Sequence, residues 1–421
     1  MDPNVPDVYN NLGVVLRRLG NKSAAVACYR KCLSLKPENA GVHSNLGNAL
    51  RDLGQLELAA ENHQRAVKLK GGNPESHFNL GLVLRDLGKL QQALNSFNKA
   101  LELNPNHVDC QWDKALTLLT MGDYQNGFDQ YEARWKLERN PPRTFSKPNW
   151  NGESLKNKRL LVFQEQGFGD MIQFSRFIPL VKDLGAKVFV EVQPELYDLF
   201  LPLKGADKII KKGNTLPAFD FCIPMMSLYK SLCISEKNMP ATFPYLFPPP
   251  NPSIKILKKP NPDEKTVGIV WAGKPTHKND LNRSCSFEHF IDLIGMPNLT
   301  IFSLQKGGKE DAIKEFGCQE LITDLSKRIK GFNDTASIIS QLDLVISVDT
   351  ATAHLAGALN KPVWVILPFA PDWRWMREDN LSVWYPSMKL FRQKEPRVWE
   401  PVLAEVKKHL SQHFKMSNTE I

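Results

Sequence analysis

The segment LDLVISVDTATAHLAGALNKPVWVILPF (residues 342–369) decides the class of fold in the second half of the chain. It is the most apolar stretch of the sequence, yet Asp349 and His354 lie inside it and Pro362 interrupts it. A membrane-spanning helix needs about 20 predominantly apolar residues in a row. Two apolar runs separated by small residues instead predict a buried strand, a helix and a second buried strand.

Similar strand-like runs lie on both sides of this segment and alternate with helix-like segments. They are RLLVFQEQ, AKVFVEVQ, DKIIKKG and FDFCIPM before a Pro-rich stretch, and TVGIVWAG, LTIFSLQ, DLVISVD and PVWVILP after it. This alternation predicts parallel sheets that are covered on both faces. We expect an α/β module of two doubly wound, Rossmann-like halves, 159–247 and 265–412, joined by a hinge at 248–264. Ligands of such sheets bind at the carboxyl ends of the strands, here in the cleft between the halves.

The first third of the chain repeats itself at an interval of 34 residues. The recurring positions are the tripeptide NLG at 11–13, 45–47 and 79–81, the glycines Gly20, Gly54, Gly88 and Gly122, and the alanines Ala25, Ala59 and Ala93. Each unit has the pattern of two helices joined by a glycine turn, and it resembles the tetratricopeptide repeat (TPR). We expect a TPR α-solenoid of about four stacked units over residues 1–135.

The groove of such a solenoid predicts a macromolecular partner. We expect the concave face to bind an extended peptide or a partner protein. The alternative is a docking or dimerisation surface without a role in substrate binding, and a homodimer is compatible with it. The sequence leaves both interpretations open.

The remaining segments and the composition set the broad class of protein. Polar, Pro-rich residues 136–158 predict a linker, and the short polar tail 413–421 predicts disorder. The N-terminus lacks the basic and apolar regions of a signal peptide. The seven cysteines contain no C-x-x-C pair, so a reducing cytoplasm is the simplest compartment.

The formal net charge of +9 suits an anionic ligand such as a nucleotide or a phosphate. A solvated basic surface is the alternative interpretation. The sequence has no long Lys/Arg block and no basic–aromatic ribbon, so we expect no nucleic-acid partner.

A glycine loop follows the first strand of the α/β module, in the stretch FQEQGFGDMIQFSRF (163–177). A dinucleotide-binding fingerprint needs a third glycine, but Ile172 occupies that position, and no acid ends the second strand. The tight loop around Gly167 and Gly169 instead places Asp170 at a helix N-terminus. Asp170 is then either a helix-capping carboxylate or a carboxylate directed into the cleft, and the glycines leave room for a ligand.

A second group of polar residues lies in the segment quoted first. Asp349 ends a strand, Thr350 begins a helix, and His354 follows about one turn later. Free N–H groups and the positive end of the helix dipole form a natural site for a pyrophosphate. The alternatives are a buried core histidine and a helix-capping aspartate.

Two further strand-end loops carry basic and polar side chains. WAGKPTHKNDLNRSCSF (271–287) and SLQKGGKE (303–310) provide Lys274, His277, Lys278, Arg283, Gln305 and Lys306. Each basic residue by itself is an ordinary surface charge. Three such loops at one sheet edge predict an anion site. The aromatic segment FAPDWRWMREDN (369–380) either packs the two halves together or closes over a ligand.

Residues from about 135 to 412 resemble the heptosyltransferase-type glycosyltransferases, which have the GT-B fold. The similar segments are EQGFGDMIQFSRFIPL, GIVWAGKPTHKNDLNRS, FNDTASIISQLDLVISVDTATAHLAGAL and PVWVILPFAPDWRWMREDN. The whole chain resembles bacterial proteins that join TPRs to such a domain. O-linked N-acetylglucosamine transferase has a similar architecture.

The resemblance implies a metal-independent, inverting transfer of a sugar from a nucleotide-diphosphate-sugar, with no other cofactor. It implies that Asp170 is the general base, and that Asp349, Thr350 and His354 contact the donor diphosphate. Ala351 replaces a glycine of the family motif. The basic residue of the donor site is matched by Arg283 or Lys274, and Gly167, Gly169, Gln305 and Lys306 complete the expected donor-binding set.

We therefore expect a cytoplasmic glycosyltransferase without a membrane span, whose TPR groove holds a protein or peptide acceptor. Two alternatives remain. One is a non-catalytic TPR scaffold with a degenerate transferase domain. The other is a transferase that acts on a glycan or a lipid-linked sugar.

Overall fold

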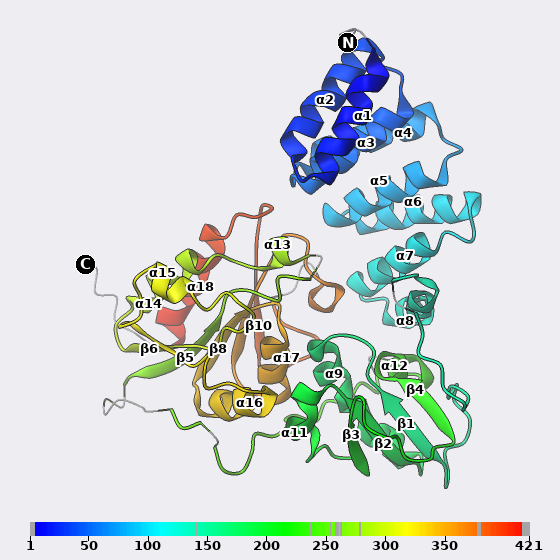
Figure 1. Cartoon of the computed structure of the whole chain (residues 1–421). Helices are drawn as coiled ribbons and strands as arrows, with labels where there is room; N and C mark the ends of the chain where they lie inside the picture. Colours follow the sequence, from blue (N-terminus) through cyan, green and yellow to red (C-terminus); the bar gives the residue numbers. More distant parts are fainter. Residues whose placement is uncertain are drawn as a thin grey trace. The chain divides into compact units, whose positions relative to one another are not determined.

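The computed structural model describes residues 5–139, 141–235, 237–252, 254–256, 261, 263–277, 279–376 and 380–414 (Figure 1). Lys278 and most of the expected disordered tail, residues 415–421, lie outside this set. The chain forms two compact units. Unit 1 comprises Met1–Pro142 with Asp372–Arg377, and unit 2 comprises Arg143–Pro371 with Glu378–Ile421.

Unit 1 contains the expected repeat array. Its helices pack in successive antiparallel pairs, namely α1 (Pro6–Arg18) with α2 (Lys22–Leu35), α3 (Ala40–Asp52) with α4 (Leu56–Leu69), α5 (Pro74–Asp86) with α6 (Leu90–Leu103), and α7 (Val108–Thr120) with α8 (Tyr124–Tyr131). The turn within each pair uses one of the periodic glycines in a left-handed conformation, with φ between 79° and 85°. Glycine adopts this conformation without steric cost, which explains its recurrence every 34 residues.

The glycine of each NLG tripeptide recurs for a different reason, which is the close approach of the two helices of a repeat. It lies under a ring from the second helix of its own pair, and a Cβ added there would lie 2.5–2.6 Å from that ring. The three contacts are Tyr29 on Gly13, His63 on Gly47 and Phe97 on Gly81. The helices can therefore approach closely only where the side chain is a hydrogen atom.

An ion-pair ladder that the sequence analysis missed links the first helices of successive repeats. An arginine of one repeat pairs with an aspartate of the next, at 2.5–2.7 Å. The pairs are Arg17 with Asp52, Arg51 with Asp86, and Arg85 with Asp113. Each pair is partly exposed and contributes about 1 kcal/mol or less to stability.

Residues 372–376 also belong to unit 1, although they follow strand β9 (Val363–Leu367) of unit 2 in the chain. The Trp373 ring packs edge-on against Phe128 of α8, with 5.5 Å between ring centroids. The Met376 methyl group lies at the Gly122 turn, and Trp375 is buried. This stretch thus completes the repeat unit, a role that neither sequence-based interpretation gave it. Residues 377–379 of the same segment lie outside the described set.

The first sheet of unit 2 has four parallel strands in the order β3-β2-β1-β4. They are β1 (Arg159–Phe163), β2 (Lys187–Val192), β3 (Lys208–Lys211) and β4 (Phe221–Pro224). The helices among them are α9 (Phe168–Phe174), the 3-10 turn η2 (Ser175–Phe177), α10 (Ile178–Asp183), α11 (Tyr197–Phe200) and α12 (Leu228–Ser231). All four strands match runs that were predicted from the sequence.

The second sheet has six parallel strands in the order β10-β9-β8-β5-β6-β7. They are β5 (Lys265–Val270), β6 (Leu299–Ser303), β7 (Ile322–Asp324), β8 (Leu344–Val348), β9 and β10 (Met388–Arg392). The helices are α13 (Asp280–Arg283), α14 (Ile291–Ile294), α15 (Ala312–Glu315), α16 (Phe332–Gln341), α17 (Ala351–Ala358) and α18 (Glu400–His413). The order reverses between β5 and β8, and such a switch point is where ligands bind.

Part of the expected linker is built into unit 2. From Arg143 onward the chain belongs to this unit. The Arg143 guanidinium pairs with the buried carboxylate of Glu191 on β2 and lies over the Phe163 ring. A parallel bridge then joins Asn149 to Cys222 of β4. This segment therefore covers part of the first sheet.

The buried histidine of the repeat array makes unit 1 sensitive to pH. His63 has no exposed surface, and neither ring nitrogen has a hydrogen-bond partner among the described residues. Burial, followed by the charges of Arg51 and Arg17, lowers the pKa of His63 from 6.5 to about 4. Between these values the unfolded chain binds a proton that the folded array does not, so stability falls as the pH decreases. The full shift corresponds to roughly 3 kcal/mol.

We expect His63→Phe to remove this pH dependence, because Phe97 fills the equivalent position of the next repeat without a polar atom. The variant should also be more stable at neutral pH, by roughly 1 kcal/mol, since no buried polar nitrogen is left unbonded. Thermal unfolding followed by circular dichroism from pH 7.5 to 4 measures both effects. His77→Phe, at a half-buried position, is the control. Parallel pH profiles of His63→Phe and the unmodified protein would contradict the prediction.

Candidate functional site

Asp170 lies in the first turn of α9, the helix that follows β1. Its Oδ2 atom accepts a hydrogen bond from the backbone N–H of Gly167, the residue before the helix, at 2.8 Å. Capping of this kind, together with the helix dipole, stabilises the charged carboxylate. Asp170 therefore caps the N-terminus of α9 through its Oδ2 atom.

Gly169 lies where the glycine loop that precedes Asp170 meets the segment that contains His354. Helices α9 and α17 pack side by side, one from each half of unit 2 (Figure 1). A Cβ on Gly169 would lie 2.9 Å from Cδ2 and 3.4 Å from Nε2 of His354. The space that the sequence analysis reserved for a ligand at Gly169 is thus filled by the His354 ring. Asp170 is the next residue of α9, so the helix that carries the carboxylate packs on the helix that carries the imidazole.

The N-terminus of α17 follows β8 at the switch point. Thr350 precedes the helix, and its hydroxyl is hydrogen-bonded to that of Ser347 at 2.9 Å. His354 lies in the first turns of α17 and is 4% exposed. Asp349 and Thr350 are partly exposed. This end of the helix offers backbone N–H groups to an anion at the carboxyl edge of the sheet.

Arg283 is the basic residue that the structure brings to this helix. Its Nη1 atom donates to the backbone carbonyl of Asp349 at 3.4 Å, and its Nε atom lies 3.5 Å from the Asp280 carboxylate. A Cβ on Gly273 would lie 2.4 Å from Nη2, so this glycine makes room for the guanidinium. Lys274 is exposed. Of the two basic candidates, the geometry therefore favours Arg283.

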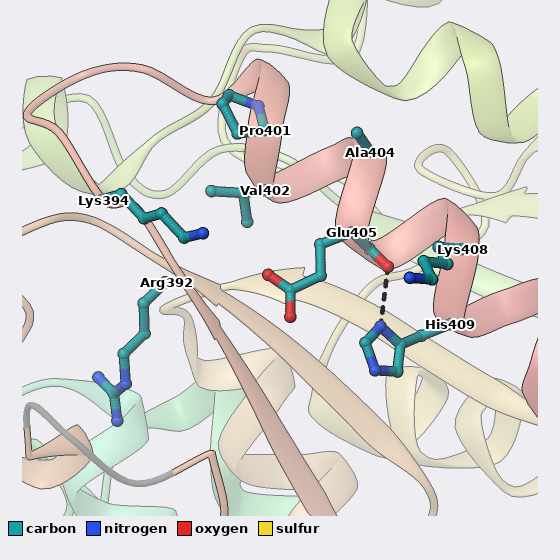
Figure 2. A pocket seen from close by; sticks show the side chains of 8 residues that line it. All are labelled: Arg392, Lys394, Pro401, Val402, Ala404, Glu405, Lys408 and His409. Carbon is teal, nitrogen blue, oxygen red and sulfur yellow. Dashed lines mark hydrogen bonds between the residues drawn. The ribbon is translucent and has the colours of Figure 1, made fainter.

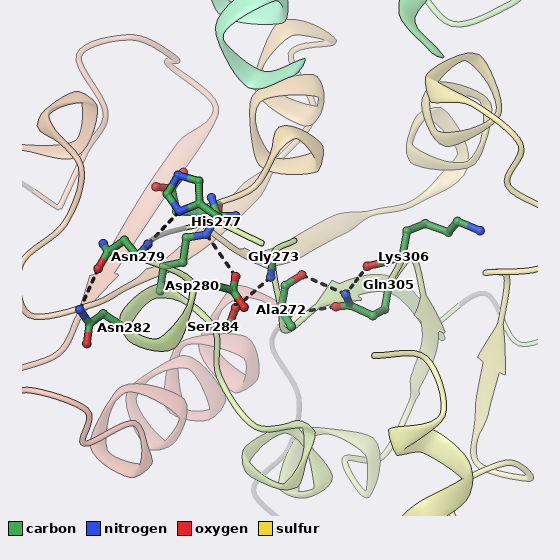
Figure 3. Close-up of polar contacts among 11 residues, drawn as sticks. Ala272, Gly273, His277, Asn279, Asp280, Asn282, Ser284, Gln305 and Lys306 are labelled. Carbon is green, nitrogen blue, oxygen red and sulfur yellow. Dashed lines mark hydrogen bonds and ion pairs between the residues drawn. The ribbon is translucent and has the colours of Figure 1, made fainter. Parts of the chain in front are cut away.

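The loop after β5 is fixed by polar contacts (Figure 3). Ser284 accepts a hydrogen bond from the N–H of Gly273 and donates one to Asp280, at 3.0 and 2.8 Å. The Gln305 amide is fully buried, accepts from the N–H groups of Trp271 and Ala272, and donates to the Ala272 carbonyl. In this structure Gln305 therefore holds the loop in place and has no surface left for a ligand.

The other two polar candidates lie at the surface. Lys306 is exposed, and its ammonium donates to the carbonyl of Ser326 at 2.9 Å. His277 is exposed, and its Nδ1 atom accepts from the N–H of Asn279.

Tyr385 belongs to the site and was missed in the sequence. Its hydroxyl is hydrogen-bonded to Nδ1 of His354 at 3.0 Å. Its ring packs on Gly357 of α17, where a Cβ would lie 2.5 Å away. Helix α17 thus packs closely against the Tyr385 ring at Gly357, and also against helix α9. No motif surrounds Tyr385, so only the three-dimensional arrangement reveals it.

A hollow of about 440 Å³ lies elsewhere in unit 2, between α18 and the end of β10 (Figure 2). Its lining includes Arg392, Lys394, Lys408 and the Glu405 carboxylate. The His409 ring donates through Nδ1 to the Glu405 carbonyl at 2.9 Å. None of the site residues predicted from the sequence lines this hollow, so it is not the site described above.

Within the described residues, no three His, Cys, Asp or Glu side chains gather as metal ligands would. No helix in the same residues is long and apolar enough to cross a membrane.

Two similar solved structures each match about a third of this chain. A fragment of MamA from Desulfovibrio magneticus RS-1 is 21% identical, with a TM-score of 0.31, and the match covers 33% of this chain and 79% of that one. YrrB, described as a TPR protein with an unusual peptide-binding site, is 22% identical, with a TM-score of 0.30, and the match covers 33% and 72%.

One curated relative matches about two thirds of the chain. Protein FlbA of Caulobacter vibrioides (strain ATCC 19089 / CIP 103742 / CB 15) is 26% identical over 307 residues, or 66% of this chain. The chain spans about half, 51%, of the length of that relative.

Different family models match the repeat array and the α/β module. Tetratricopeptide repeat models match residues 6–39, 47–85 and 74–107. The model of glycosyltransferase family 9 (heptosyltransferase) matches residues 309–366, which include β8, Asp349, Thr350, His354 and α17. The chain therefore carries a TPR array followed by an α/β module that is similar to glycosyltransferases of family 9.

Proposed function

We propose that this protein is a metal-independent, inverting glycosyltransferase that uses a nucleotide-diphosphate-sugar. The observation that carries the proposal is the contact of Gly169 with His354, because it joins the carboxylate-bearing helix α9 to the anion-binding end of α17. A base and a site for the leaving group are the two elements that sugar transfer requires.

The residues fit the chemistry of each reacting group. The acceptor oxygen forms a bond to the anomeric carbon, the bond from that carbon to the diphosphate oxygen breaks, and the hydroxyl proton passes to Asp170. The diphosphate gains negative charge as it leaves. The N–H groups at the start of α17 and the Arg283 guanidinium would stabilise that charge without a metal ion.

The acceptor in this proposal is a protein or peptide that binds the repeat array. The first helices α1, α3, α5 and α7 contact one another and share one face of the array. That face is polar: it carries the arginine–aspartate ladder, and Asn45 donates to the Asn10 side chain at 3.0 Å. Amide and charged groups of this kind suit hydrogen bonding to an extended backbone.

Donor binding should depend on Arg283 and not on Lys274. We expect Arg283→Ala to weaken the binding of nucleotide diphosphates by roughly 10- to 100-fold, because a charge-assisted hydrogen bond is lost. Lys274→Ala is the matched control, since it removes an exposed cation from the same loop. The shift in melting temperature with a panel of nucleotides and nucleotide-sugars measures both variants. No shift with any of them for the unmodified protein would favour a non-catalytic scaffold.

Transfer should depend on Asp170 while donor binding does not. We expect Asp170→Asn to lower kcat by roughly 100-fold or more, because an amide cannot accept the acceptor proton. The amide oxygen can still accept the Gly167 hydrogen bond, so the melting shift with the donor should persist. A normal rate of transfer by Asp170→Asn would exclude this aspartate as the base.

Recognition of a protein acceptor should depend on the shared face of the first helices. We expect Asn45→Ala to reduce kcat/KM for a protein acceptor by roughly tenfold, since hydrogen bonds to the acceptor are lost. Asn95→Ala, an exposed amide on the second helix α6, is the control. Equal rates for the two variants and the unmodified protein would remove this face from the proposal, whereas no transfer to any protein by the unmodified chain would favour a glycan or lipid-linked acceptor.

A further inference from the structure

Arg176 is a buried cation next to the site. It lies on η2, directly after α9, and is 3% exposed. Its guanidinium donates to the carbonyls of Gln173 and Trp384, at 3.0 and 2.8 Å, and to the hydroxyl of Tyr245 at 3.2 Å. All three acceptors are neutral, so the positive charge is not cancelled by these hydrogen bonds.

Aromatic rings surround this charge. The guanidinium carbon lies 4.8–5.8 Å from four ring centroids, those of Phe243, Tyr245, Trp384 and Tyr385. The faces of these rings attract a cation. Arg176 therefore fixes the segment that contains Trp384 and Tyr385 against the helix that carries Asp170.

Tyr385 transmits this constraint to His354. The Tyr385 ring lies 4.9 Å from Arg176 on one side and packs on Gly357 of α17 on another. Its hydroxyl lies 3.0 Å from Nδ1 of His354, and the opposite edge of the imidazole, Cδ2 and Nε2, faces Gly169. The His354 ring is thus held between a hydroxyl and a glycine.

We propose that Tyr385 is a positioning residue for His354, and that its hydroxyl donates to Nδ1 so that the neutral imidazole carries its proton on Nε2. The cation over the phenol ring withdraws electron density and makes the hydroxyl a better donor. In this tautomer Nε2–H is the donor group of the imidazole, and we assign it to the leaving diphosphate. That last role rests on the sugar transfer proposed above, whereas the tautomer does not.

The tautomer can be measured on the full chain without substrate. In long-range ¹H–¹⁵N spectra of ¹⁵N-histidine-labelled protein, His354 is assigned by the signals that His354→Gln removes. We expect a protonated Nε2 and an unprotonated, hydrogen-bonded Nδ1. Tyr385→Phe keeps the ring on Gly357 but removes the hydroxyl, so the Nδ1 signal should move and a mixture of tautomers should appear. In a transfer assay the same variant should lose kcat roughly tenfold, the effect of one hydrogen bond, with KM for the acceptor unchanged.

Tyr245→Phe is the matched control, because it also removes a hydroxyl next to Arg176 but not one bonded to His354. We expect it to leave the His354 signals unchanged. A proton on Nδ1 of the unmodified protein would overturn the proposal, as would equal spectra for the Tyr385→Phe and Tyr245→Phe variants. A changed tautomer with unchanged kcat would instead count against the use of His354 in transfer, so the two failures are distinguishable.

Discussion

The close contact between Gly169 and the His354 ring is the constraint on which the candidate site depends. Any side chain at Gly169 would collide with the imidazole, so helices α9 and α17 can pack at this distance only because the residue is glycine. The contact packs the helix of one half that carries the Asp170 carboxylate against the helix of the other half that carries His354. The first half by itself provides the carboxylate of Asp170, and the second half by itself provides the N-terminus of α17 with His354.

The loops at the switch point are held by the protein before any ligand binds. Gln305 fastens the loop after β5 through its amide, Ser284 fastens the next turn, and Arg283 reaches the carbonyl of Asp349. Such contacts cost conformational entropy when the chain folds and not when a ligand binds. A site that must stabilise charge without reorganisation benefits from this arrangement.

Much of the fold follows from patterns in the sequence. The 34-residue period defined the repeat array, and every strand of the first sheet lies in a run that was predicted to be a strand. Strands β7 and β10, of three and five residues, were not predicted. The sequence also placed Asp170, Asp349, Thr350 and His354 at strand ends, because parallel strands bring their carboxyl ends to one edge.

What the sequence does not contain is the contact between distant segments. The choice of Arg283 over Lys274 depends on which cation reaches the carbonyl of Asp349, and spacing along the chain does not decide this. Tyr385 lies in no motif, and its role comes from the ring and the helix that it touches. The ion-pair ladder of the repeats, by contrast, has a strict period in the arginines and could have been found.

The course of the chain through residues 372–376 changes how the two units are connected. Unit 1 is completed by a stretch that lies more than 200 residues after its last repeat helix, with Trp373 packed on Phe128. The backbone therefore crosses between the units three times, after Pro142, after Pro371 and after Arg377. Cleavage of the backbone before Arg143 would leave two fragments that share one folded unit. The array is thus a discontinuous domain, and the pieces of such a cut should remain associated as a noncovalent complex.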